Sequence, residues 1–176
     1  LDKLEQSMAE RGVAIAAARR ELAARLDKAS LCTSGCFPVA NVTAVGLIEG
    51  WLNNVPALEA EQRFAVELKK NRRRDGESGK TELGPHRSDF VVVHSAKDLP
   101  AVQCSTGEQK ALLIAIILAN TRLHARERNR IPLLLLDEVA AHLDSKRRKA
   151  LFDEIYNLGA QAWLTGTDLA FFESFG

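Results

Sequence analysis

The sequence predicts an α/β chain in two parts, a mainly helical domain over residues 1–80 and a lobe of alternating strands and helices over residues 81–176. Three observations predict this class. Residues 1–29 are rich in Ala, Glu, Lys and Arg and hold no proline, which is typical of a long helix. Residues 75–79 are polar and glycine-rich, which indicates a break. After that break, short apolar runs alternate with periodic helical segments, as in a lobe with parallel strands.

The composition excludes several classes of protein. Hydrophobic residues make up 46% of the chain and charged residues 27%, which argues against a disordered, collagen-like or membrane protein. The net charge is only +1, so any contact with nucleic acid needs a local basic patch. No basic, apolar and small-residue pattern opens the sequence, so we expect no signal peptide, and three cysteines suit a reducing cytoplasm. Because the sequence begins at Leu1, inside a predicted helix, we expect it to be a piece of a longer protein.

The first part is predicted to be helical. A helix over residues 1–29 would place five large apolar side chains near one face, namely Leu4, Met8, Ile15, Leu22 and Leu26. Residues 40–54 are apolar and fit either a helix or a buried strand. Pro56 can open a further helix over residues 57–73, because proline is tolerated in the first turn.

A basic run follows this helix. Five of the six residues at 69–74 are basic, and they are candidate DNA contacts: Lys69, Lys70, Arg72, Arg73 and Arg74. The alternative is a solvated helix end, since Lys and Arg favour the C-termini of helices. Residues 75–79 are predicted to be a loop, and the main boundary of the chain is placed there.

The second part alternates between the two kinds of element. Strands are predicted at residues 90–93, 131–136 and 162–165, and helices at residues 108–126 and 145–157. The strand at 131–136 is expected to be fully buried, and Trp163 is expected in the core.

Two carboxylates directly follow the apolar run of the middle strand. Ligands of open α/β sheets lie beyond the carboxyl ends of strands, which is where Asp137 and Glu138 are expected. Asp137 suits a Mg²⁺ that bridges nucleotide phosphates, and Glu138 could act as a general base toward an attacking water. The alternative is a chance pair of acids where a strand meets solvent.

A second candidate site opens the preceding helix. Ser105 is a helix N-cap, and Glu108 three residues later completes a capping box. The same helix end, with its hydroxyl and with Gly107 allowing close approach, is also a possible anion site. Asp144 and the polar residues around Thr167 are expected at the same end of the sheet.

In order and spacing these motifs resemble the ABC-type ATPase heads of the SMC and RecF group. Ser105-Thr106-Gly107-Glu108 resembles the signature motif, and Leu133–Asp137 with Glu138 resembles the Walker B strand and its catalytic glutamate. Ala141–Asp144 resembles the D-loop, and Thr165–Asp168 takes the place of the switch loop. The resemblance implies the C-terminal lobe of a P-loop ATPase head, preceded by a helical arm.

The narrower resemblance is to the RecF family, because Gly84-Pro85-His86-Arg87 resembles a characteristic segment of that family. It implies an ATP-dependent homodimer that binds DNA at single-strand/double-strand junctions in gap repair and replication restart, with RecR, RecO and RecA as partners. Asp137 would hold Mg²⁺ and Glu138 would orient water. Ser105 and Gly107 would reach the γ-phosphate of ATP bound to the partner, and Asp144 would link the two sites.

The chain departs from the family pattern at several positions. Glu108 stands where the signature motif usually carries Gln, and a carboxylate beside a γ-phosphate is electrostatically worse than an amide. Ser88 stands where relatives often have Asp. Thr167 stands where many relatives of the larger group have His, although its hydroxyl could still bond phosphate or water. Residues 76–81 end in Gly-Lys-Thr without the full Walker A pattern.

Walker A lies N-terminal to the helical arm in this group, so we expect it outside this chain. The parent protein is expected to be a slow DNA-dependent ATPase, and the chain alone is expected to be inactive. Three alternatives remain: a non-catalytic DNA- or protein-binding module, a piece of another SMC-like repair ATPase, and an overcoming-lysogenisation-type nuclease, which would need an extra metal-binding domain. The role of His86 stays open between holding its loop and contacting nucleotide or DNA.

Overall fold

The computed structural model describes residues 1–31, 36–139 and 143–168. The chain divides into two compact units. The first unit consists of Leu1–Ala24 and Val42–Val91, and the second of Arg25–Asn41 and Val92–Gly176. The units are therefore interleaved along the sequence, and residue 80, the predicted domain boundary, lies inside the first unit.

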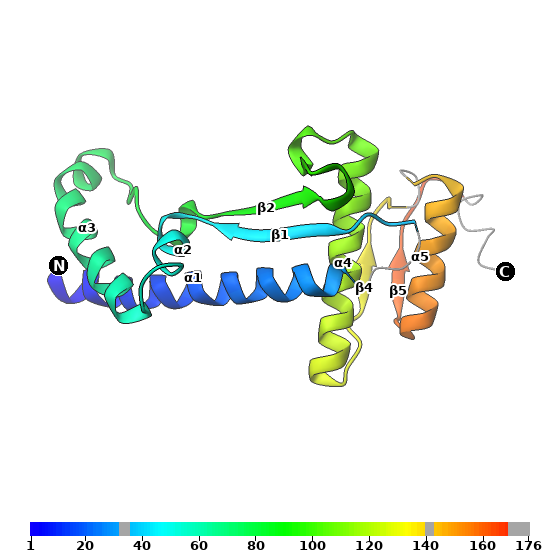
Figure 1. Cartoon of the computed structure of the whole chain (residues 1–176), viewed down its shortest axis with the longest axis horizontal. Helices are drawn as coiled ribbons and strands as arrows, with labels where there is room; N and C mark the ends of the chain where they lie inside the picture. Colours follow the sequence, from blue (N-terminus) through cyan, green and yellow to red (C-terminus); the bar gives the residue numbers. More distant parts are fainter. Residues whose placement is uncertain (32–35, 140–142, 169–176) are drawn as a thin grey trace. The chain divides into compact units, whose positions relative to one another are not determined.

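Three helices carry the core of the first unit. They are α1 (Asp2–Ser30), which continues into the second unit, α2 (Leu47–Trp51) and α3 (Ala57–Ser78), as Figure 1 shows. The buried face of α1 in this unit consists of small residues, Ala9, Val13 and Ala16, which pack with Phe64 of α3. The predicted apolar face was therefore wrong here, because Leu4, Met8, Ile15 and Leu22 are all at least 37% exposed. Only Leu26 of that set is buried.

The helix α3 extends beyond its predicted end. The predicted loop at residues 75–79 was wrong, because the helix continues to Ser78 and stops at Gly79, whose φ of 66° is the left-handed conformation of a helix cap. Arg73 and Glu77 form an ion pair four positions apart (3.3 Å), which supports this last stretch of helix.

The ambiguous segment at residues 40–54 holds both kinds of element, the strand β1 (Ala40–Val45) and then α2. β1 belongs to a sheet of order β1-β2-β3, with β2 at Asp89–His94 and β3 at Leu99–Pro100. β2 was predicted in the parallel lobe, and that was wrong, because β2 and β3 are antiparallel. The paired residues His94 and Leu99 are joined by a tight reversal in which Asp98 has a φ of 48°, whereas a parallel pair needs a long crossover.

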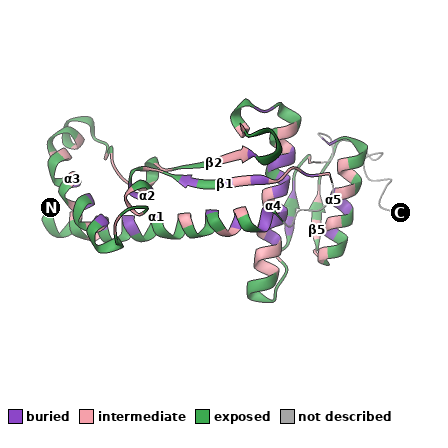
Figure 2. Ribbon diagram, in the orientation of Figure 1, coloured by how far each residue is buried: buried purple, intermediate pink, exposed green. Residues whose placement is uncertain are grey.

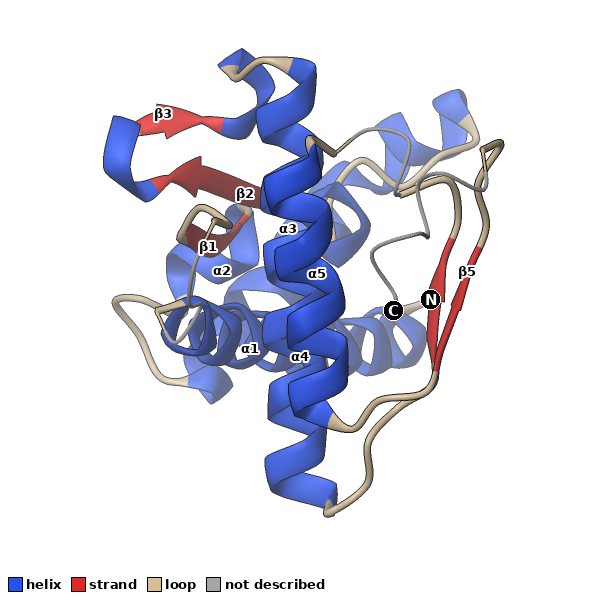
Figure 3. Ribbon diagram, turned by 90° about the vertical axis from the view of Figure 1, so that its right-hand side faces the viewer, coloured by secondary structure: helices blue, strands red, loops and turns tan. Residues whose placement is uncertain are grey.

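The second unit contains the predicted strand–helix–strand alternation. Its elements are α4 (Thr106–Arg128), β4 (Leu134–Leu136), α5 (Ser145–Leu158) and β5 (Ala162–Leu164). β4 and β5 are parallel, with Leu134 opposite Ala162 and Leu136 opposite Leu164. Figure 3 shows α4 and α5 on the same side of this strand pair. The core is built from Ala111, Ile114, Ala115 and Leu118 of α4, Leu134 and Leu136 of β4, and Leu151, Phe152 and Ile155 of α5. None of the helices in the described ranges is long and apolar enough to cross a membrane.

The strand β4 is buried on one face only. Leu134 and Leu136 are 6% and 4% exposed, whereas Leu133 and Leu135 are 50% and 71% exposed. Trp163 of β5, expected in the core, is 66% exposed. Figure 2 shows buried residues along α4. Successive side chains of a strand point to opposite faces, and α4 and α5 cover only one of them. We call Leu133, Leu135 and Trp163 the open sheet face.

Candidate active site

The carboxyl end of β4 carries the first group of site residues. Asp137 and Glu138 directly follow β4, and Thr165 directly follows β5. The Thr165 hydroxyl donates a hydrogen bond to Asp137 Oδ1 and accepts one from the Glu138 N–H (2.9 Å). The Thr165 N–H also donates to the carbonyl of Leu136 (3.1 Å). One threonine therefore ties the ends of both parallel strands together.

Glu138 has an unusual backbone. Its φ is 50°, in the left-handed region that few residues other than glycine adopt. The hydrogen bond from its N–H to Thr165 stabilises this turn, and the side chains of both Asp137 and Glu138 remain exposed. Such outliers are common where a site requires a particular geometry. The position of the two acids at the strand end agrees with the sequence expectation, and their roles stay predictions.

Asp137 has the chemistry for a magnesium site. Mg²⁺ is often bound by only one or two protein carboxylates, with waters and phosphates as its other ligands. The exposed carboxylate of Asp137 at a strand end fits that requirement. In the described part of the chain no three metal-ligating side chains gather into one cluster.

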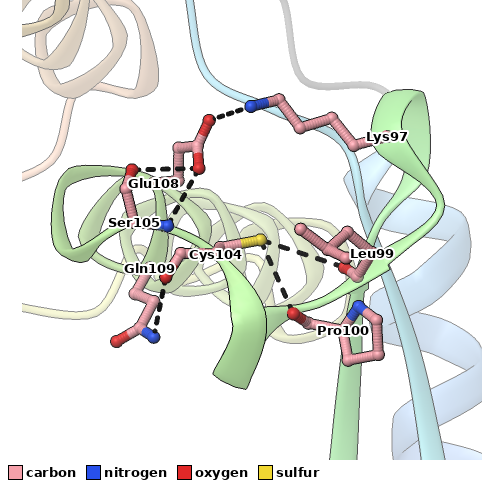
Figure 4. A network of polar contacts seen from close by, with 7 residues as sticks. All are labelled: Lys97, Leu99, Pro100, Cys104, Ser105, Glu108 and Gln109. Atoms are coloured by element: carbon pink, nitrogen blue, oxygen red, sulfur yellow. Dashed lines mark hydrogen bonds and ion pairs between the residues drawn. The ribbon is translucent and has the colours of Figure 1, made fainter.

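The second group of site residues lies at the start of α4. Both the backbone N–H and the hydroxyl of Ser105 donate to Glu108 Oε2, at 3.0 and 2.9 Å (Figure 4). The predicted capping box is therefore confirmed. Gly107 is exposed, and a Cβ built on it would meet no atom within 4 Å among the described residues. Packing in this chain does not require glycine there.

Lys97 is a member of this group that the sequence analysis missed. Its ammonium forms an ion pair with Glu108 Oε1 (Figure 4). This contact, followed by the two hydrogen bonds from Ser105, lowers the pKa of Glu108 to about 2. The hydrogen bond to Glu108 also raises the pKa of Lys97. The carboxylate is thus ionised at neutral pH and has its own counter-ion.

The segment just before Ser105 is fixed by Cys104. Its thiol is buried and lies 3.9 Å from the carbonyl of Leu99 and 3.6 Å from that of Pro100. The Gln109 side chain donates to the Cys104 carbonyl (3.2 Å), as Figure 4 shows. These contacts hold Ser105 at the helix start.

The two groups lie toward the same end of the second unit. Residues 129–133 join α4 directly to β4, so the two elements run in opposite directions (Figure 3). The start of α4 and the carboxyl end of β4 therefore face the same way. No contact between described residues joins Ser105 or Glu108 to Asp137 or Glu138.

Asp144 and Thr167 were the remaining predicted nucleotide contacts. Asp144 is the N-cap of α5 and accepts a hydrogen bond from the Arg147 N–H (2.8 Å). Thr167 is exposed and makes no side-chain hydrogen bond with a described residue, so Thr165 is the threonine that contacts the acids. Residues 141 and 142 of the D-loop motif lie outside the described residues.

The basic run on α3 is largely paired with acids. Arg72 binds both Asp2 and Glu5, which lowers the pKa of each carboxyl group through hydrogen bonding and charge. Lys70 pairs with Glu67, Arg73 with Glu77 and Arg74 with Glu82. Lys69 makes no ion pair with a described residue, although its charge also lowers the pKa of Asp2. DNA contact by this run stays a prediction.

Residues 36–172 match the family described as "AAA domain, putative AbiEii toxin, Type IV TA system". The chain therefore belongs to this AAA-domain family.

Its curated relatives are RecF proteins. The chain is 49% identical to the "DNA replication and repair protein RecF" of Mesorhizobium japonicum over 98% of its length, and 48% identical to that of Brucella abortus over 99%. Each alignment covers 46% of the relative, so the chain spans about half the length of these proteins. The sequence resemblance to RecF is thus confirmed.

Solved structures agree on the fold. The "Structure of the recombination mediator protein RecF-ATP in RecFOR pathway" matches 94% of this chain with a TM-score of 0.69 at 21% identity. A second structure, of RecF-ATPrS in the RecFOR pathway, matches 96% of this chain with a TM-score of 0.72 at 20% identity. This chain covers 45% of each. The predicted fold class is confirmed.

Proposed function

We propose that the chain is part of a RecF-type protein that acts in recombinational gap repair and replication restart in the cytoplasm. In this proposal ATP drives homodimerisation, and the dimer binds DNA at single-strand/double-strand junctions and helps RecR and RecO to load RecA. The relatives are named DNA replication and repair proteins, and one matching structure is that of the recombination mediator protein RecF-ATP in the RecFOR pathway.

One observation carries the ATPase part of the proposal. Two exposed carboxylates, Asp137 and Glu138, lie at the carboxyl end of a parallel strand pair and are held there by Thr165. This is the usual ligand-binding edge of an α/β sheet. Asp137 would hold Mg²⁺, which supplies charge neutralisation at the nucleotide phosphates. Glu138 would accept the proton of the attacking water.

The start of α4 would contact the nucleotide that is bound to the partner protomer. Ser105 and Gly107 are exposed at a helix N-terminus, where backbone N–H groups favour an anion. Glu108 does not oppose a phosphate there as a bare carboxylate would, because Lys97 neutralises it. Asp144 and Thr167 complete the proposed set. The portion of the relatives that this chain does not span would supply Walker A.

The test uses the protein extended to the length of its relatives. Sedimentation with ATP and Mg²⁺ on gapped DNA compares the wild type with three variants. Glu138→Gln should bind ATP without turnover and accumulate the dimer, and Ser105→Arg should abolish the dimer. Thr165→Val, which removes the hydroxyl between the acids but keeps the shape, should slow turnover and leave dimerisation intact. A wild type that neither dimerises nor hydrolyses ATP would refute the ATP-driven clamp.

The alternative is that the chain by itself is a non-catalytic DNA- or protein-binding module. The exposed cations of α3 favour it, since Arg73 and Arg74 are 90% and 72% exposed despite their ion pairs. Binding of labelled DNA to the 176-residue chain without ATP tests it. Equal affinity of this chain and the longer protein, with no effect of ATP on either, would favour the module.

A further inference from the structure

A surface groove in the first unit holds cations that the α3 run does not include. The groove encloses about 340 Å³ and is lined by Lys80, Thr81, Glu82, His86 and Arg87. The Lys80 ammonium and the Arg87 guanidinium form no ion pair with any residue in the described ranges. Glu82 lies in the same groove, but Arg74 faces its carboxylate at 3.7 Å. Two positive charges in the groove are therefore uncompensated.

A second groove adjoins the first and is mostly apolar. It encloses about 390 Å³ and shares Thr81 and His86 with the cationic groove. Its other lining residues are Met8, Arg11, Gly12, Ile15, Phe64, Leu83, Gly84 and Pro85. Met8 and Ile15 are 37% and 45% exposed on α1. An imidazole thus stands between a cationic surface and an apolar one.

The loop that carries this imidazole is held in one conformation. Gly84 has a φ of 146°, which other residues rarely adopt, and a Cβ there would lie 3.0 Å from His86 Nδ1. His86 Nε2 lies 2.8 Å from the carbonyl of Thr81, so Nε2 carries the donated hydrogen. The Arg19 guanidinium donates to the carbonyl of Pro85. These contacts fix the loop that contributes to both grooves.

We propose that the two grooves together bind one unpaired nucleotide of single-stranded DNA. Its phosphate would lie between Lys80 and Arg87, and its base would stack on His86 and pack against Met8 and Ile15. Bases of single strands stack on aromatic side chains, including histidine, while cations follow the backbone. In duplex DNA the bases are stacked inside, and the apolar groove would stay unused. The proposal deepens the DNA binding proposed above and rests on it.

The cations of this site differ from those of α3 in their ion pairs. Four of the five basic residues in the α3 run are paired with acids of the same unit, whereas Lys80 and Arg87 are not. A phosphate that binds α3 must compete with those carboxylates. A phosphate in the groove meets no such competitor at either cation.

The test measures the anisotropy of three labelled DNAs across a salt series, with the protein at the length of its relatives. The DNAs are a single-stranded thymine oligomer, the same backbone without bases, and a blunt duplex. Lys80→Ala/Arg87→Ala should weaken binding to both single strands about tenfold at low salt. It should also reduce the slope of log K against log salt by about 0.7, the value for one lost phosphate contact on a single strand. Met8→Ala/Ile15→Ala should weaken binding to the thymine oligomer at least about fivefold and leave the abasic strand unchanged.

Two further double variants serve as comparisons. Lys3→Ala/Arg63→Ala removes the same charge from the same unit away from the grooves, and its affinity should match the wild type. Lys70→Ala/Arg73→Ala probes α3 and should lose less than the groove pair. Thermal unfolding monitors the fold of each variant, and the thymine-to-abasic affinity ratio reports base contact even where total affinity drops.

Three outcomes would overturn the site. They are equal losses in the α3 and groove pairs, an unchanged thymine-to-abasic ratio in the apolar pair, and losses confined to duplex DNA. A wild type that binds none of the DNAs would instead refute the DNA binding proposed above, and the site with it. If the groove variants lose affinity as expected but the wild type does not dimerise with ATP, only the ATP-driven dimer would be refuted.

Discussion

Glu108 illustrates how neighbouring residues accommodate an unfavourable side chain. A carboxylate at this position would repel a phosphate approaching Ser105. Here Lys97 supplies the opposite charge, and Ser105 supplies two hydrogen bonds. The three residues together carry no net charge. The glutamine that usually occupies this position of the motif is neutral by itself and needs no counter-ion. The pairing thus allows the motif to tolerate an acid.

This pairing predicts a pH dependence of stability. The pKa of Glu108 is lowered in the folded state to about 2, from an ordinary value of 4.5. Its contribution to the free energy of unfolding is therefore fully present above about pH 4.5 and is lost as the pH falls through 2. Glu108→Gln should be less stable than the wild type at pH 5, and the difference should shrink toward pH 2.5. Urea unfolding at several pH values measures it.

Lys97→Met is the matched control for that prediction. It removes the main cause of the lowered pKa, so it should also flatten the pH dependence between about pH 5 and pH 2.5. A stability difference that stays constant over this range in both variants would contradict the assignment.

The sequence alone predicted part of the site. Asp137, Glu138 and Ser105 were predictable because adjacent residues define a strand end or a helix cap. Thr165 and Lys97 were not predicted as contacts. Thr165 reaches Asp137 across 28 positions, and Lys97 reaches Glu108 from a tight turn that has no periodic pattern. Such contacts follow from tertiary structure, which local patterns do not encode.

At the level of elements, α1 packs through its small residues. Gly12 faces Phe64, and a Cβ at that position would lie 2.7 Å from a ring carbon. The helix can approach α3 closely only because that side chain is absent. A hydrophobic pattern highlights Leu and Met and does not reveal a face made of Ala and Gly, which explains the wrong face predicted for this helix.

Two glycine substitutions in helices should therefore have opposite effects. Gly12→Ala should lower the free energy of unfolding by about 1–3 kcal/mol, because overpacking against Phe64 outweighs the better helix propensity. Gly76→Ala in α3 should raise it by about 0.5–1 kcal/mol, since a Cβ there meets nothing within 4 Å. Urea denaturation of both variants checks the signs. Stabilisation by Gly12→Ala would show that the helix does not pack on Phe64 as described.

Elements with strong local signals were predicted well, and their pairing was not. α4, β4, α5 and β5 lie close to their predicted ranges. β2 was recognised as a strand but assigned to the wrong sheet, because strand partners depend on the connection. The polar composition of residues 75–78 suggested a loop, yet the Arg73–Glu77 ion pair and the cap at Gly79 keep them helical.

At the scale of the whole molecule, the open sheet face is an apolar surface that the described residues leave uncovered. Leu133, Leu135 and Trp163 expose three large apolar side chains on one side of a parallel pair. Parallel sheets are normally covered on both faces. The chain spans 46% of its curated relatives, and we propose that the rest of such a protein covers this face.

The fluorescence of Trp163 measures whether the open sheet face is covered. In a Trp51→Phe background it is the only tryptophan of these 176 residues, and any tryptophan outside them in the extended protein is replaced by phenylalanine. In the 176-residue chain its emission should be that of a solvated indole and should be quenched readily by iodide. In the protein extended to the length of its relatives, the emission should shift to the blue and quenching should fall. Equal quenching in both would mean that another surface meets the remaining chain.

The burial of Cys104 has a consequence for the chemistry of the site. Its thiol is protected by the carbonyls of Leu99 and Pro100 and stands one residue before Ser105. A maleimide can alkylate this sulfur only when the segment opens locally. The alkylation rate of Cys104, followed separately from the other two cysteines, therefore reports how often the start of α4 leaves its closed conformation. Any ligand that binds Ser105 in that conformation will slow the alkylation, and because Cys104 is native, no cysteine has to be engineered into the chain.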